Sequence, residues 1–206
     1  MVYGLTGFRP KAQPRPSPTF TVTSAPTAEP ITLDELKTRL RIGGCDFDNE
    51  LSDLLKAGRE QVESDTCRKL ITQTVRMDIE DFASLTGPIE IRLAPIQSIT
   101  HVKYYDQDDV LQTYDAAKYY SNLTSTPPEL VLKQSQQWPN TEEYRPNKVQ
   151  ITMVAGYGAA TAVPRMAKLA IVEWCRVNWE GCSHDLAAYK RLISSLEWTA
   201  YHKVWT

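Results

Sequence analysis

The stretch VQITMVAGYGAATAVPRMAKLAIVEW, residues 149–174, contains both kinds of secondary structure that define this chain. Its first residues alternate between apolar and polar side chains, which predicts a half-buried strand over residues 149–154. Gly156 and Gly158 then interrupt the alternation. A helix is predicted from Pro164, because proline lacks an amide that would be unpaired at the first helical position. The stretch therefore predicts a sheet joined to a helix through a glycine corner.

A glycine pair between a strand and a helix is also typical of phosphate-binding loops. A dinucleotide loop needs a third glycine where Thr161 stands, a helix directly after it and a parallel strand–helix–strand unit. A Walker loop needs a Gly-Lys-Ser/Thr ending, and Pro164 lacks one of the amides that would bind phosphate. These features are missing, so we interpret Gly156 and Gly158 as a structural corner and predict no cofactor site.

Two helices are predicted downstream of the corner, within residues 164–197. Gly181 is expected to end the first helix and Ser183 to cap the second. Apolar residues recur at helical spacing and are expected to face the core. They are Met166, Leu169, Ala170, Trp174 and Val177 in the first helix, and Leu186, Tyr189, Ile193 and Leu196 in the second.

Residues 71–155 change to a period of two and predict a small antiparallel sheet. Alternating apolar residues mark two strands: Val75, Met77 and Ile79, then Ile89, Ile91 and Leu93. Further strands are expected at residues 99–105, 118–123, 130–132 and 149–154, separated by turn residues such as Gly87-Pro88 and Pro127-Pro128. A sheet inserted between helices gives an α+β fold.

Residues 32–66 predict two more helices, which complete a helical bundle around the inserted sheet. Thr32 and Glu35 have the spacing of a capping box, and Gly43-Gly44 is expected to stop the first helix. Asp46 or Asp48 is expected to cap the second helix, which runs to about Thr66. The leucines at helical spacing, Leu33, Leu36 and Leu40 and then Leu51, Leu54 and Leu55, are expected to pack on other elements.

Residues 1–30 are predicted to form an extended N-terminal arm. Six of the 13 prolines lie here, and proline removes backbone donors and fixes φ, so neither a helix nor a sheet interior is expected. An arm without a core of its own is ordered only where something else holds it. We infer that it lies along a neighbouring chain, with Tyr3, Phe8 and Phe20 as candidate anchors; a disordered tail is the alternative.

Bulk composition disfavours several functional classes. The net charge of -2 gives no general attraction to DNA phosphates, so specific DNA binding is not expected. No apolar run is long enough to predict a membrane span. The four cysteines form no CxxC pair, which indicates free thiols in a reducing cytoplasm.

No motif predicts a catalytic or a metal site. The acids Asp46, Asp48 and Glu50 resemble the start of an EF-hand loop, but Leu51 and Ala57 stand where glycine and glutamate are required. We interpret these acids as favourable charges at a helix start. No serine lies in a GxSxG motif, and no HExxH or Cys/His spacing surrounds the three histidines, His101, His184 and His202. A hydrolase whose triad is assembled only by the fold stays an alternative.

Residues 198–206 form a C-terminal aromatic tail. Trp198, Tyr201 and Trp205 recur at the spacing of one helical face. Such side chains are typical interface anchors, so this stripe is a candidate partner-binding site; a helix folded back on its own core is the alternative. Four strand tyrosines likewise suit a subunit contact, a sugar-binding face or half-buried strand positions: Tyr104, Tyr105, Tyr119 and Tyr120.

The order of these pieces resembles the head-tail connector, or adaptor, proteins of tailed phages, prophages and gene-transfer particles. The segments that carry the resemblance are ITLDELKTRLRI, DNELSDLLKAGREQVESDTCRKLITQTV, IEIRLAPIQSITHVKYYD and VQITMVAGYGAATAVPRMAKLAI, between Ile31 and Val177. Two features depart from it. Asp108-Asp109 stands where such sequences often have Asp-Gly in a hairpin turn, and the arm before Ile31 is longer than expected.

The resemblance implies a non-enzymatic structural protein of the virion, made in the host cytoplasm. Residues 31–197 would be the connector domain and would form a ring, commonly of twelve copies, between the portal protein and a tail-side stopper or tail completion protein. DNA would pass along the ring axis without tight binding, and the C-terminal segment would dock on the portal. A module that binds a glycan or another small ligand is the alternative from another class.

Overall fold

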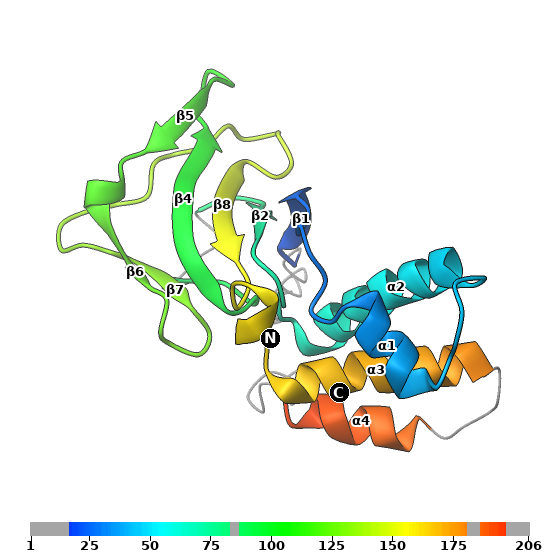
Figure 1. Ribbon diagram of the computed structural model, residues 1–206. Helices are drawn as coiled ribbons and strands as arrows, with labels where there is room; N and C mark the ends of the chain where they lie inside the picture. Colours follow the sequence, from blue (N-terminus) through cyan, green and yellow to red (C-terminus); the bar gives the residue numbers. More distant parts are fainter. Residues whose placement is uncertain (1–16, 83–86, 181–185, 197–206) are drawn as a thin grey trace, which may run out of the picture.

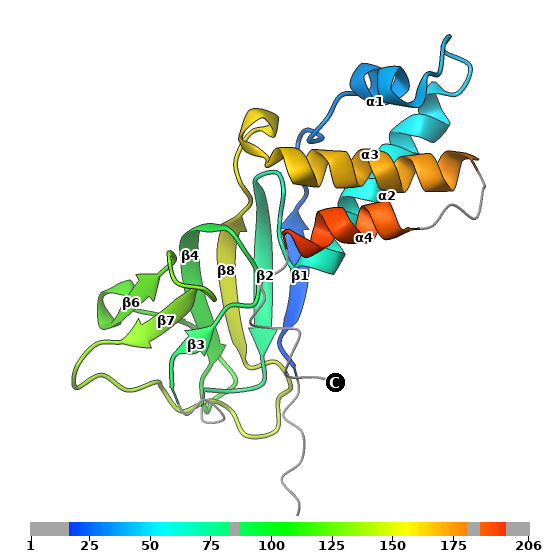
Figure 2. The same cartoon turned by 90° about the horizontal axis from the view of Figure 1, so that it is seen from below.

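The computed structural model describes residues 17–82, 87–180 and 186–196. Over these residues the fold is α+β, as predicted, with four α-helices and two antiparallel sheets (Figure 1). The helices gather into one layer at one end of the molecule, and the sheets form the other end (Figures 1 and 2). The β region is therefore larger than the small sheet that the sequence predicts.

The larger sheet has five strands in the order β1-β2-β8-β4-β5. These strands are β1 (Thr19–Ser24), β2 (Gln73–Ile79), β8 (Val149–Ala155), β4 (Ile96–Tyr105) and β5 (Leu111–Tyr114). Its centre is the pairing of β2 with β8, in which Val75 lies opposite Met153 and Met77 lies opposite Ile151. All four of these side chains are fully buried, so the predicted alternation does mark the core face of this sheet.

The smaller sheet has three strands in the order β3-β7-β6 and shares its core with the larger one. Its strands are β3 (Ile89–Glu90), β7 (Glu129–Leu132) and β6 (Tyr119–Asn122), and a 3-10 turn, Ala116–Lys118, precedes β6. Ile89 and Leu130 are partners across β3 and β7, and both are buried in that common core. The strand predicted through Leu93 is short because regular pairing stops at Glu90.

The helical layer consists of α1 (Leu33–Leu40), α2 (Asp48–Thr66), α3 (Arg165–Glu180) and α4 (Ala187–Ser194). Helix α3 packs against both α2 and α4, which lie on opposite sides of it in Figure 1. Gly58 of α2 permits the close approach to α3, since a Cβ at this position would lie 3.1 Å from Cys175 Sγ and from Trp174 Cε3. A second apolar core lies between these helices.

Several helix ends differ from the prediction. The capping box is present, because the Glu35 amide donates to Thr32 Oγ1 and the Thr32 amide donates to Glu35 Oε2. However, α1 ends at Leu40 with Arg41 in the left-handed region, before the glycines that were expected to stop it. Neither Asp46 nor Asp48 caps α2: Phe47 occupies the N-cap without a side-chain hydrogen bond, and Asp48 pairs with Lys37 at 2.7 Å.

Two further observations concern the hairpin turn at Asp108-Asp109 and the start of α3. Asp109, in the β4–β5 hairpin, has φ of 59°, the left-handed region that favours the glycine of related turns. Pro164 lies one residue before α3, and its carbonyl accepts from the amides of Ala167 and Lys168. The residues predicted to end α3 and cap α4, Gly181 and Ser183, lie outside the described residues.

The first described residues correct the prediction of an arm over residues 1–30. Thr19–Ser24 forms β1, which pairs with β2 in antiparallel register as an edge strand of the chain's own sheet. Prolines flank this segment, but none lies within TFTVTS, and its β-branched and aromatic residues favour a strand. The prediction was wrong here because it considered the prolines of residues 1–30 together, although residues 19–24 contain none.

The glycine pair at 156 and 158 is a structural corner, as predicted. Gly156 has φ of 123°, and a Cβ there would lie 2.4 Å from the carbonyl oxygen of Ile71. Its amide donates to the Pro95 carbonyl, and the Thr72 amide donates to the Gly158 carbonyl. The corner therefore binds the segment that links α2 to β2, and it holds the sheets against the helical layer.

A buried polar network strengthens the same junction. The Glu63 carboxylate on α2 accepts from the Leu70 amide at 2.9 Å, from Lys69 Nζ at 3.0 Å and from Gln73 Nε2 at 3.1 Å. Arg59 lies beside it at 3.4 Å and also pairs with Glu29 at 2.8 Å. Buried charges are tolerated only when they are paired in this way.

Candidate functional site

The structure describes one of the six predicted partner-binding residues. Phe20 lies on β1, where it is half-buried and packs against the core shared by the two sheets. It therefore contacts its own chain. Tyr3, Phe8, Trp198, Tyr201 and Trp205 lie outside the described residues, and their roles stay predictions.

Two of the four strand tyrosines, Tyr104 and Tyr119, belong to an aromatic cluster inside the β region. Phe82 and Trp138 stack with centroids 4.7 Å apart and planes 2° apart, and Tyr114 lies 5.0 Å from Trp138. Tyr119 is buried and Tyr104 half-buried in the same cluster, whereas Tyr120 is exposed and its ring faces Lys133. Burial raises the pKa of both the Tyr114 and the Tyr119 hydroxyl. Half-buried strand positions therefore account for most of these tyrosines.

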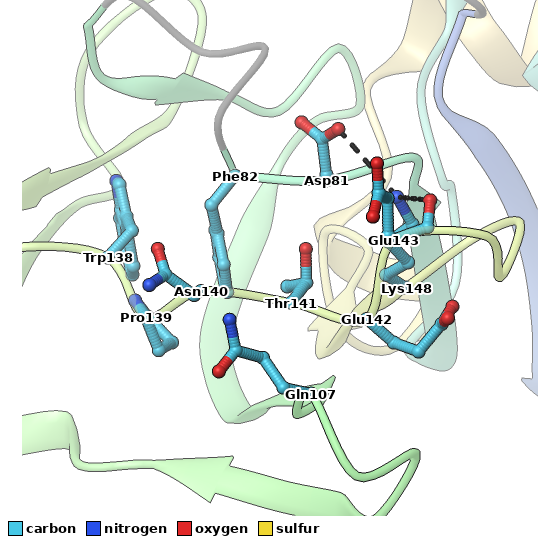
Figure 3. Close-up of a pocket in the computed structure, with 10 residues that line it drawn as sticks. All are labelled: Asp81, Phe82, Gln107, Trp138, Pro139, Asn140, Thr141, Glu142, Glu143 and Lys148. Atoms are coloured by element: carbon cyan, nitrogen blue, oxygen red, sulfur yellow. Dashed lines mark hydrogen bonds and ion pairs between the residues drawn. The ribbon is translucent and has the colours of Figure 1, made fainter.

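A pocket of about 430 Å³ opens beside this cluster, between the segment after β2 and the segment before β8 (Figure 3). Its wall combines apolar surface from Trp138 and Pro139 with the polar side chains of Gln107, Asn140 and Thr141. Phe82 also lines it, but only 3% of this residue is exposed. Trp138 covers one face of the Phe82 ring, so the stacked pair does not offer two open faces to a ligand.

The charged side of the pocket is largely occupied by contacts within the chain. Lys148 is buried, its Nζ donates to the Glu143 carbonyl at 2.9 Å, and it lies 4.0 Å from Asp81 Oδ2. The Arg145 amide donates to the Glu142 carboxylate, and the Arg145 guanidinium pairs with Asp109 and lies over the Tyr105 ring at 3.4 Å. This arrangement closes a long loop onto the sheet and pairs Lys148 and Arg145 within the chain, while the side chains of Gln107, Asn140 and Thr141 still line the pocket.

Burial shifts the pKa of two side chains of types that often take part in catalysis, Cys175 and His101. Cys175 is fully buried, and burial raises the pKa of its thiol to about 12, which disfavours a thiolate nucleophile. Burial, together with the nearby Lys103, lowers the pKa of His101. Within the described ranges no three metal-ligating side chains gather, the cysteines are free, and no helix is both long and apolar enough to cross a membrane.

The exposed face of α3 was assigned to the core by the sequence pattern. Met166 and Leu169 are 39% and 38% exposed, whereas the buried residues of the helix are Ala167, Ala170, Ile171, Val172 and Cys175. The predicted stripe is therefore rotated around the helix. Large apolar side chains on an outer helix face are a common feature of interfaces between proteins.

A shallow groove of about 470 Å³ lies nearby, against α4. It is lined by Trp174, Leu186, Tyr189 and Ile193, with Gln61 and Asp65 from α2. The Tyr189 hydroxyl donates to Asp65 Oδ2 at 2.6 Å. Burial, together with this hydrogen bond, raises the pKa of the Tyr189 hydroxyl. The described chain ends beside this region, where Arg68 donates to both the Leu196 carbonyl and the Tyr157 hydroxyl.

Comparisons with known proteins give a fold and no family. No protein-family model matches the sequence, and no curated protein matches it. Among solved structures, the chain is similar to one from the "Neck of empty GTA particle computed with C6 symmetry", with a TM-score of 0.72 and 19% identity. That match covers 87% of this chain and 95% of the other.

Two further structures carry the same fold. One is from the "Virion of native gene transfer agent (GTA) particle", with a TM-score of 0.70, and the other from the "Neck of native GTA particle computed with C12 symmetry", with a TM-score of 0.66. Both are 19% identical to this chain and cover 86% and 87% of it, and 94% of their own chains. The fold of this chain is thus that of proteins found in the neck of such particles.

Proposed function

We propose that this chain is a structural component of the neck of a tailed-phage or gene-transfer particle. In this role it is an adaptor that forms a ring beneath the portal and joins the capsid to the tail. The observation that carries the proposal is the match to the neck chains, which covers most of both proteins with a TM-score of 0.72. A match of this extent includes both the helical layer and the β region, so it concerns the whole arrangement of the chain.

The proposed ring has twelve copies and lets DNA pass along its axis. The similar chains belong to necks with C6 and C12 symmetry, and a twelve-copy ring is compatible with both. A net charge of -2 suits a channel, because multiple basic contacts would hold DNA phosphates and slow their passage. The chain would reside in the virion after synthesis in the host cytoplasm.

The partners on the two sides of the ring are the portal and a tail-side stopper or tail completion protein. The aromatic stripe of Trp198, Tyr201 and Trp205 would dock on the portal, and the residues before Ser17, with Tyr3 and Phe8, would lie along a neighbouring chain. Changing both Trp198→Ala and Trp205→Ala should leave the midpoint of thermal unfolding nearly unchanged and abolish attachment to the portal in a pull-down. Attachment at the wild-type level would contradict the docking role.

Electron microscopy of the chain mixed with the portal of its own particle tests the proposal directly. An end-on ring bound to the portal, with a countable number of copies, is the expected result. A monomer that ignores the portal and binds sugars saturably would favour the glycan-binding alternative, with the pocket beside Trp138 as its site. Catalytic turnover that depends on one polar residue would favour a hydrolase.

A further inference from the structure

Charge is unevenly divided between the helices of the helical layer. Helix α2 carries six acidic and two basic side chains, whereas α3 and α4 together carry five basic and two acidic ones. Helices α2 and α4 lie on different sides of α3 in Figure 1 and meet at the groove lined by Asp65 and Lys190, so the two signs of charge gather on different parts of the layer. Such a division gives the layer a negative and a positive side.

The negative side is the outer face of α2, which we call the acidic face. Its exposed carboxylates are those of Glu50, Asp53 and Glu60, at spacings of three and seven residues that place them along one stripe. Lys56 pairs with Asp53 at 3.2 Å and Arg59 with Glu60 at 3.2 Å, but Glu50 has no ion-pair partner among the described residues. The stripe stays net negative.

The positive side, which we call the basic face, is formed by Arg165 and Lys168 of α3 and by Lys190 and Arg191 of α4. None of these four side chains has an ion-pair partner within the described part of the chain. The exposed Met166 and Leu169 lie among the α3 cations. In Figure 2, α3 and α4 lie on the near side of the layer and α2 crosses behind α3.

We propose that the basic face of one copy packs on the acidic face of the next copy of this chain. The inference rests on the proposed ring and names the surfaces that build it. Two different faces on one molecule form a head-to-tail contact, which closes into a ring when the rotation between neighbours allows it. Packing either face against itself would bring like charges together, so a two-fold dimer through these surfaces is disfavoured.

The contact supplies what each surface lacks. The cations of α3 and α4 gain carboxylates, and Met166 and Leu169 are removed from water against the uncharged part of the α2 stripe, which includes Ala57. Peripheral charges of this kind mainly set orientation and partner choice. They also make the contact sensitive to salt, because exposed charges are screened over about 8 Å at physiological ionic strength.

Charge-reversal variants of the full chain test this pairing. One variant carries Asp53→Lys and Glu60→Lys, the other carries Arg165→Glu and Arg191→Glu, and self-association is measured by sedimentation velocity at low and high salt. Each variant alone should associate at least about tenfold more weakly than the wild type, since like charges then meet. A mixture of the two should regain association, because every contact between unlike variants again brings opposite charges together.

The matched control reverses two exposed acids on loops of the β region, Asp108→Lys and Glu143→Lys, with the same change in net charge as the α2 variant. It should associate like the wild type, and circular dichroism should show all variants folded. The pairing is overturned if the wild type stays monomeric at every concentration and salt, if the control weakens association equally, or if the mixture associates no better than either variant alone. Binding of a labelled DNA duplex that is lost only in the Arg165→Glu and Arg191→Glu variant, without self-association, would also overturn it.

The neck role and the face pairing can fail separately. Rings on the portal that form equally well from wild-type and charge-reversed chains would refute the pairing and leave the neck role intact. Salt-sensitive association through these faces, with no binding to the portal, would leave the pairing intact and refute the adaptor role.

Discussion

The centre of the β region and the outer face of α3 treat their large apolar side chains in opposite ways. In the β region, Val75, Met77 and Met153 are completely buried between the two sheets. On α3, Ile171 and Cys175 are fully buried, but Met166 and Leu169 are more than a third exposed. Each region thus has a core of its own, and the outer face of α3 retains apolar surface that a neighbour could cover.

The two regions nevertheless depend on one junction. The glycine corner binds the segment between α2 and β2, and Glu63 binds the start of that segment from the helical side. A substitution at the junction should therefore destabilise both regions. Substitutions within one region should lower the free energy of unfolding by an amount that depends on how deeply the changed side chain is buried.

The largest effect is expected for Gly156→Ala. The new Cβ would lie 2.4 Å from the Ile71 carbonyl oxygen, and φ of 123° is strained for any residue with a side chain. We expect a loss of more than about 5 kcal/mol in the free energy of unfolding, or failure to fold, measured by urea denaturation. Gly43→Ala is the control, because a methyl group at residue 43 would have no atom within 4 Å. Similar losses for both variants would contradict the role of the corner.

A slightly smaller loss is expected for Glu63→Ala. The change removes the acceptor of Leu70, Lys69 and Gln73 and leaves a buried cation at Arg59 with one partner fewer, which typically costs about 3–5 kcal/mol. Glu60→Ala is the matched control, since Glu60 also pairs with Arg59 but is exposed. It should change the free energy of unfolding by less than about 1 kcal/mol. Equal effects in chemical denaturation would show that the network does not join the regions.

Local sequence patterns predicted the parts of this fold in which neighbouring residues decide the structure. The capping box of Thr32 and Glu35, the alternation in β2 and β8, and the corner at Gly156 are all of this kind. The α+β class followed from their order along the chain. The sequence resemblance to connector proteins and the structural match to a chain from the neck of a GTA particle indicate the same kind of fold.

The features that the sequence did not predict depend on contacts between distant residues. Pairing of β1 with β2 joins Phe20 to Met77 across more than fifty residues, and a count of prolines does not reveal it. The predicted orientation of α3 was wrong because several registers of its apolar residues fit a helical stripe. Packing against α2 at Gly58 selects the register in which Ile171 and Cys175 face the core. The sequence already contains the excess of acidic residues in α2 and of basic residues in α3 and α4. How these helices are arranged around each other could be seen only in the structure.

The contrast between buried and exposed methionines gives the next prediction. Met77→Ala empties a fully buried position in the β region and should lower the free energy of unfolding by about 3 kcal/mol. Met166→Ala changes a side chain that is already 39% exposed and should cost less than about 1 kcal/mol in the monomer. Thermal unfolding of both variants at one concentration checks the difference. Comparable losses would mean that the outer face of α3 contributes as much to stability as the buried centre of the sheets.

The smallest expected effect is a pH dependence of stability that comes from His101 in the β region. Burial holds the pKa of His101 on β4 below its usual 6.5, so the unfolded chain takes up a proton at a higher pH than the folded chain does. Stability from this group is therefore complete above pH 6.5 and declines as the pH falls towards the folded pKa. Urea denaturation at pH 7.5 and pH 6.0 should show a small loss at the lower pH that is reduced in His101→Gln. An unchanged loss in this variant would show that His101 is not the pH-sensitive group.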